Sequence, residues 1–271
     1  MNYHDFYTKS INDRALFWRE QASEISWYSS PIKTLSTDFN GYPIWFEDGE
    51  LNMSYLCIDK HIEDGYGEDI AIYYDSPVTG KKEVITYFQL YEEVARLAGG
   101  LKDLGLKKGD TTIIYMPMIP QAIYAMLACA RLGVTHSVVF GGFAPHELAI
   151  RIDDCKPKLI ITASSGKEID KIIPYKPFVD EAILKSNHKP LQVITYQRNL
   201  QQVDWVSKSY DVDYERLVAQ SNPIKPVRVA STHPLYILYT SGTTGTPKGI
   251  VRDTGGYATA LKFSMKYVYG V

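Results

Sequence analysis

The chain has 271 residues, of which 45% are hydrophobic and 22% are charged, and its 29 lysines and arginines stand against 31 aspartates and glutamates. This composition excludes a disordered chain and predicts a globular protein long enough to bury a sizeable core. The formal net charge of -2 argues against a dedicated nucleic-acid binder.

Targeting and redox signals are also weak. No apolar run approaches the roughly 18 residues of a membrane span, and the start MNYHDFYTKS resembles neither a signal peptide nor an Arg-rich transit peptide. Cys57, Cys129 and Cys155 are too widely spaced for a disulfide framework or a metal-ligand pair. We therefore expect a reducing, cytoplasmic setting with no membrane contact and no bound metal.

The first part of the chain shows little periodicity. A helix is predicted over 13–23, followed by turn residues such as Pro31 and Asn40-Gly41. We expect residues 1–69 to form an irregular N-terminal layer that packs on a larger domain over 70–271.

The pattern changes at residue 70. Residues 70–74 and 83–85 are predicted to pair as a hairpin. Thr86 and Gln89 have the spacing of a capping box, in which each side chain satisfies a free backbone N–H at a helix start. Apolar residues continue at helical spacing until Gly105, which suits the end of that helix.

Strands and helices then alternate. Strands are predicted over 111–116, 134–140, 159–163, 192–195 and 235–240. Helices are predicted over 121–132, 145–155, 178–186, 214–220 and 255–269. The alternation indicates an α/β fold of parallel βαβ units. Such an array normally continues beyond this point, so we expect an incomplete sheet.

The segment that carries the chemistry lies near the carboxyl end, in the sequence YTSGTTGTPKGI. Its glycines allow close backbone approach to an anion, its N–H groups can form an anion-binding nest, and its lysine adds one positive charge. The spacing differs from that of a Walker A loop, and the alternative is a solvated linker. The predicted phosphate ligands are Thr240, Ser241, Gly242, Thr243, Thr244, Gly245, Thr246, Lys248 and Gly249.

This segment resembles the phosphate-binding signature of the AMP-forming, adenylate-forming enzymes, which include acyl-CoA synthetases, adenylation domains and luciferases. Residues 138–143 (VVFGGF) and 45–52 resemble the acetyl/propionyl-CoA synthetase branch. Residues 172–176 and 248–253 are more similar to the propionyl type than to the acetyl type. The resemblance covers essentially the whole chain and implies the large N-terminal α/β domain of that superfamily.

The resemblance implies a two-step ligase for a short-chain carboxylate. The carboxylate and ATP give an acyl adenylate and pyrophosphate, with Mg²⁺ assisting, and the CoA thiol then displaces AMP. It also places Gly141 and Gly142 near CoA. Acetyl-type members carry two arginines for the CoA 3′-phosphate just beyond; here Lys167 and Lys171 are the possible replacements, and lysine lacks the bidentate fork of arginine.

No residue of the chain is predicted to be catalytic by itself. His136, in a predicted strand, is interpreted as a hydrogen-bonded core residue. Arg252 is compatible with a nucleotide contact and equally with a place at the surface or at a helix start. No pair of histidines has the spacing of a zinc site.

Two interpretations of the chain stay open. In the first it is the N-terminal fragment of a short-chain acyl-CoA synthetase and is inactive alone, because further family motifs lie beyond the phosphate loop. In the second it is a non-catalytic nucleotide- or CoA-binding module that acts with a partner chain. A third, weaker option is an adenylation domain that acts on a carrier-protein thiol.

Overall fold

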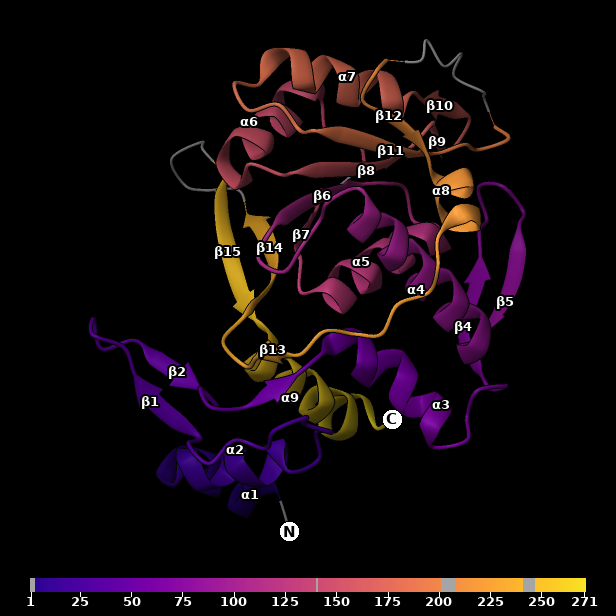
Figure 1. The fold of residues 1–271 in the computed structure, drawn as a ribbon. Helices are drawn as coiled ribbons and strands as arrows, with labels where there is room; N and C mark the ends of the chain where they lie inside the picture. Colours follow the sequence, from indigo (N-terminus) through magenta and orange to yellow (C-terminus); the bar gives the residue numbers. More distant parts are fainter. Residues whose placement is uncertain (1–2, 140, 201–207, 241–246) are drawn as a thin grey trace.

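A seven-stranded sheet forms the centre of the molecule (Figure 1). The computed structural model describes residues 3–139, 141–200, 208–240 and 247–271. The strand order is β12-β11-β8-β6-β7-β14-β15, and every neighbouring pair is parallel except β14 and β15. The bounds are β6 Thr111–Tyr115, β7 Thr135–Val138, β8 Leu159–Ala163, β11 Gln192–Tyr196, β12 Asp211–Asp213, β14 Pro234–Thr240 and β15 Lys248–Asp253. The predicted α/β class is confirmed.

Helices cover both faces of this sheet, in two layers. On one face lie α4 (Tyr87–Asp103), α5 (Pro120–Leu132) and α8 (Tyr214–Gln220); on the other lie α6 (Pro145–Cys155) and α7 (Tyr175–Lys185). Successive strand residues point to opposite faces, so Ile160 joins the core under α6 and α7 whereas Ile161 joins the core under α4 and α5. Both cores are buried, which explains why every residue of β8 is buried and all but Thr162 are apolar.

The connections reverse direction in the middle of the sheet. From β6 the chain passes through α5 to β7, and it then crosses back over β6 to reach β8. In open α/β sheets, ligands bind outside the carboxyl ends of the strands near such a reversal. The residues after β6, β7, β8, β11 and β14 therefore meet at the edge where a site is expected.

Local sequence signals set the helix boundaries. The Thr86 hydroxyl accepts a hydrogen bond from Gln89 N at 3.3 Å, and the Gln89 amide oxygen accepts one from Thr86 N at 2.9 Å. The predicted capping box is thus confirmed. Gly133 ends α5 in the left-handed region with φ 67°, as glycine does readily.

The N-terminal layer contains more regular structure than predicted. Its elements are α1 Tyr3–Asn12, α2 Arg14–Ala22, β1 Leu35–Thr37, β2 Pro43–Trp45, β3 Glu50–Leu51, the π-helical turn η1 Tyr55–Asp59 and α3 Lys60–Glu63. The strands β1 and β2 pair with each other, while β3 pairs with β13 (Val229–Ala230), far along the chain. In Figure 1 this layer lies below the sheet, beside α9.

A buried polar cluster ties this layer to the sheet domain. Arg131 on α5 is fully buried, and its guanidinium donates two hydrogen bonds to the Asp59 carboxylate at 2.7 and 2.8 Å. The Asn52 amide donates to Ala130 O at 2.9 Å and to Val227 O at 2.7 Å. Segments more than seventy residues apart are joined at this point.

Three further features complete the fold. The strands β4 (Ile70–Asp75) and β5 (Lys82–Thr86) form the predicted hairpin, and β9 (Gly166–Glu168) pairs with β10 (Lys171–Ile173). After β15 the chain continues as α9 (Thr254–Ser264) and the π-helical turn η2 (Met265–Tyr269). None of the described helices is both long and apolar enough to cross a bilayer.

Candidate nucleotide and CoA site

The predicted phosphate loop joins two antiparallel strands. Thr240 at the end of β14 pairs with Lys248 at the start of β15. Strand β15, which the sequence analysis did not predict, lies between the loop and the helical segment predicted over 255–269, which the structure contains as α9 and η2. The predicted ligands Ser241, Gly242, Thr243, Thr244, Gly245 and Thr246 lie outside the described residues.

The two ends of this loop are open to solvent. Thr240 and Lys248 are both exposed, and so is every residue of β15 before Asp253. The Lys248 ammonium makes no ion pair or hydrogen bond within the part of the chain that the structure describes. Its positive charge is therefore available to an anion.

Gly249 has a packing role that the sequence did not reveal. A Cβ at this position would lie 3.0 Å from Ile237 Cγ2 and 3.1 Å from Tyr239 Cε1. Gly249 lies in strand β15 and is not among the glycines with positive φ. Its missing side chain thus lets the Tyr239 ring lie across the two strands.

The loop after β7 is fixed from two sides. The Tyr115 hydroxyl donates hydrogen bonds to Phe143 O at 2.7 Å and to Gly141 O at 3.2 Å. A Cβ on Gly141 would overlap the hydroxyl and the ring of Tyr175. Gly141 is buried for this reason, whereas Gly142 is exposed.

The same tyrosine lies against the hairpin that carries the two predicted lysines. A Cβ on Gly166, at the start of β9, would come within 2.8 Å of the Tyr175 ring. Lys167 is half-buried on β9, and Lys171 is exposed on β10. The structure therefore brings Gly141 and this hairpin together around Tyr175, at the carboxyl edge of the sheet.

A second group of side chains, around Arg151, was not predicted from the sequence. Arg151 on α6 is 5% exposed, and its guanidinium carbon lies 4.6 Å from the Phe143 ring centre and 5.5 Å from the Tyr239 ring centre. The Tyr239 hydroxyl donates a hydrogen bond to Asp154 at 2.6 Å. Contacts between residues so distant in sequence leave no local pattern.

Two groups beside Arg151 have a pKa that is raised by burial. Burial, followed by the hydrogen bond to Asp154, raises the pKa of Tyr239. Burial raises the pKa of the Cys155 thiol to about 12. Both groups stay protonated near pH 7.

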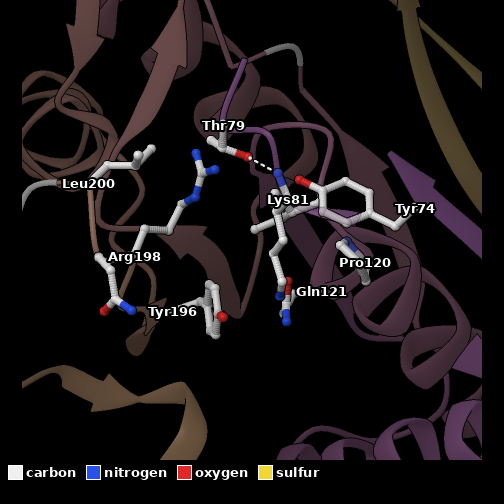
Figure 2. Close-up of a pocket in the computed structure, with 10 residues that line it drawn as sticks. Tyr74, Thr79, Lys81, Pro120, Gln121, Tyr196, Arg198 and Leu200 are labelled. Carbon is white, nitrogen blue, oxygen red and sulfur yellow. Dashed lines mark hydrogen bonds between the residues drawn. The ribbon is translucent and has the colours of Figure 1, made fainter. Parts of the chain in front are cut away.

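A separate cavity opens at the same edge, on the side of α5 (Figure 2). It has a volume of about 230 Å³ and is bounded by the β4–β5 hairpin, the start of α5 and the residues after β11. Lys81 and Arg198 bring two positive charges to its wall, between the rings of Tyr74 and Tyr196. Lys81 pairs with Glu83 at 2.7 Å, and Arg198 donates to Ser165 O at 3.2 Å. Of the predicted phosphate and CoA ligands that the structure describes, none lines this cavity.

The structure shows the positions of His136 and Arg252, whose roles were interpreted from the sequence above. His136 is buried on β7, as predicted, but its Nδ1 has no hydrogen-bond partner among the described residues. Arg252 is exposed in β15 opposite Tyr236. It does not begin the helix, because Asp253 caps α9 by accepting from Gly256 N at 3.0 Å.

Within the described ranges, no group of three or more His, Cys, Asp or Glu side chains could hold a metal ion.

The chain matches two family models and is similar to several known proteins. The family model "AMP-binding enzyme" matches residues 60–270, and "Acetyl-coenzyme A synthetase N-terminus" matches residues 3–57. The chain is 52% identical over its whole length to the uncharacterized protein PA3568 of Pseudomonas aeruginosa, covering 43% of it. It is 50% identical to the mitochondrial acyl-CoA synthetase short-chain family member 3 of Bos taurus, over 99% of the chain and 39% of the relative.

An acetyl-coenzyme A synthetase of Pseudoalteromonas atlantica is 42% identical over 99% of the chain and 42% of the relative. Among solved structures, the acetoacetyl-CoA synthetase from Streptomyces lividans matches with a TM-score of 0.86 and 24% identity, over 98% of the chain and 40% of that structure. This likeness shows the fold alone. The chain spans about two fifths of the length of these relatives.

Proposed function

Because the chain belongs to the AMP-binding enzyme family, we propose that it is the N-terminal portion of an AMP-forming short-chain acyl-CoA synthetase. In the first step a carboxylate oxygen attacks the α-phosphorus of ATP, the bond to the β-phosphate breaks, and pyrophosphate leaves. In the second step the CoA sulfur attacks the acyl carbon, AMP leaves, and the thiol proton is released.

The β14–β15 hairpin is the observation that carries this proposal. It presents an exposed Lys248, which has no ion pair among the described residues, beside a Gly- and Thr-rich connection at the carboxyl edge of a parallel sheet. An exposed ammonium group at this place is suited to neutralising the charge of a triphosphate. The substrate carboxylate is already ionised at neutral pH, so positioning and electrostatics are sufficient and no general base is needed.

For CoA we propose the neighbouring group around Tyr175. Gly142 is exposed beside the buried Gly141, and Lys167 and Lys171 stand on the adjacent hairpin. The two lysines would meet a phosphate as point charges. Their removal should weaken CoA binding and leave ATP binding unchanged.

The acid is proposed to be propionate, with acetate as the second choice. The resemblance of residues 172–176 and 248–253 to the propionyl type supports this order. The widely spaced, free cysteines favour a reducing compartment such as the cytoplasm, although the mammalian relatives are named as mitochondrial.

Propionate-dependent exchange of pyrophosphate into ATP tests the proposal. The full-length protein should catalyse it and the 271-residue chain alone should not. Lys248→Ala in the full-length protein should reduce exchange roughly 10- to 100-fold, the effect of losing one charge-assisted contact. Lys185→Ala is the matched control, because Lys185 is an exposed lysine that pairs with Glu181 on α7.

Several outcomes would overturn the proposal. Exchange by the isolated chain would show that the remaining part is not needed. Nucleotide binding by a full-length protein that lacks exchange with every short-chain acid would favour the non-catalytic module. Transfer of the acyl group to a carrier-protein thiol, with no response to CoA, would favour an adenylation domain.

A further inference from the structure

We infer that Arg151 is a positioning residue that couples the loop after β7 to the strand that leads into the phosphate loop. The first segment holds the proposed CoA contacts, and the second holds the proposed ATP contacts. The functional consequence of this coupling rests on the proposed function, whereas the physical coupling itself does not.

The geometry places one guanidinium against a ring from each segment. Phe143 belongs to the loop after β7, and Tyr239 is the residue before Thr240 on β14. The Arg151 guanidinium carbon lies 4.6 Å from the first ring centre and 5.5 Å from the second. Both distances are within the range of cation–π attraction. A single side chain therefore contacts both segments.

The charge of Arg151 is satisfied inside its own helix. Its Nη1 donates hydrogen bonds to the backbone oxygen of Glu147 at 2.6 Å and to the carboxylate of Glu147 at 2.9 Å. Glu147 precedes it by one helical turn. Since the edge of the guanidinium is occupied locally, its faces are free to contact aromatic rings.

Each segment also has an anchor of its own. The Tyr115 hydroxyl holds the loop after β7 through the carbonyl oxygens of Gly141 and Phe143. The Tyr239 hydroxyl holds the end of β14 through Asp154. Removing one of these hydroxyls should loosen one segment, whereas removing the Arg151 guanidinium should loosen both. This contrast separates coupling from a general loss of packing.

Hydrogen–deuterium exchange on the 271-residue chain tests the physical coupling. Arg151→Met should raise exchange roughly two- to fivefold in peptides covering both 141–144 and 236–240, as expected for the loss of one cation–π contact at each. Tyr115→Phe should raise it only in 141–144, and Tyr239→Phe only in 236–240. Arg151→Lys should also raise exchange in both peptides, because a single point charge cannot lie over two rings while it keeps the bonds to Glu147.

The coupling would be disproved if Arg151→Met changed neither peptide or only one of them, or if Arg151→Lys matched the unmodified chain. A uniform rise across all helices would instead indicate a purely structural role, and it too would disprove the inference. This measurement does not require enzymatic activity, so it decides the coupling even if the proposed function fails.

Kinetics of the full-length protein test the consequence. Arg151→Met should raise KM for ATP in pyrophosphate exchange and KM for CoA in thioester formation, each roughly two- to fivefold. Tyr239→Phe should raise only the first, and Tyr115→Phe only the second. A fall in kcat with both KM values unchanged would overturn the positioning role. Absence of exchange in the unmodified protein would count against the proposed function instead.

Discussion

Two buried arginines on successive helices, Arg131 on α5 and Arg151 on α6, use the same side chain in different ways. Arg131 is 0% exposed and Arg151 is 5% exposed, and their helices cover opposite faces of the sheet. Arg131 pairs with Asp59 from the N-terminal layer, whereas Arg151 pairs with Glu147 one turn earlier. When its carboxylate partner is distant in sequence, a buried arginine links two parts of the chain. When its partner lies one turn away on the same helix, the faces of the guanidinium stay available for contacts with side chains of loops.

The largest expected effect follows from breaking the distant pair. Arg131→Met should lower the free energy of unfolding by about 3–5 kcal/mol, because Asp59 would be left as a largely buried, unpaired charge. Urea unfolding of the chain measures this loss. In Arg131→Met/Asp59→Leu the unpaired charge is gone, so part of the stability should return. A loss below about 1 kcal/mol in the single variant would contradict the comparison.

His136 on β7 is a third buried ionisable residue, and unlike the two arginines it has no ion pair among the described residues. Burial lowers the pKa of His136 to about 4 from 6.5, and its neighbours across the sheet are Thr112 and Tyr236. Between pH 6.5 and pH 4, His136 binds a proton in the unfolded chain but not in the folded chain. Stability should therefore be complete above pH 6.5 and fall as the pH drops toward 4, by roughly 3 kcal/mol.

Unfolding measured between pH 7 and pH 4 checks this slope. His136→Asn should remove that share of the pH dependence, and His146→Asn, at an exposed position on α6, should not. Equal slopes for His136→Asn and the unmodified chain would mean that His136 can be protonated in the folded state.

The smallest effect is expected at the local pair. Arg151→Met should lower the free energy of unfolding by only about 1–2 kcal/mol, the sum of two cation–π contacts. Its partner Glu147 is 35% exposed at the side chain and can return to water. The urea titration used for Arg131→Met measures this loss as well. Similar losses of unfolding free energy in the two variants would contradict the difference between the two arginines.

The sheet domain could be predicted because its signals are local. The capping residues Thr86 and Gln89, the stop at Gly133 and the apolar run of β8 each act over a few positions, and all were found where the sequence placed them. Strand β15 was missed for the opposite reason. Its residues through Arg252 are exposed, so no alternation of apolar and polar residues marks it.

The predicted site residues stay a prediction, because the structure describes only the two ends of the phosphate loop. The phosphate loop was found as a motif, but the packing needs of Gly141 and Gly249 depend on Tyr175 and Tyr239, which a linear pattern does not connect. The Asp59–Arg131 pair spans 72 positions, and the contact of Arg151 with Tyr239 spans 88 positions. Tertiary contacts of this kind are set by how the chain crosses itself.

The bond from Asn52 to Val227 spans 175 positions, and this span bears on synthesis by the ribosome. At about 5–20 residues per second, the acceptor carbonyl is made roughly 9–35 seconds after the amide that needs it. During that interval strand β3 also lacks its partner β13. The first fifth of the 271-residue chain therefore lacks these contacts until the sheet has been synthesised. A chaperone would be of most use at this nascent stage.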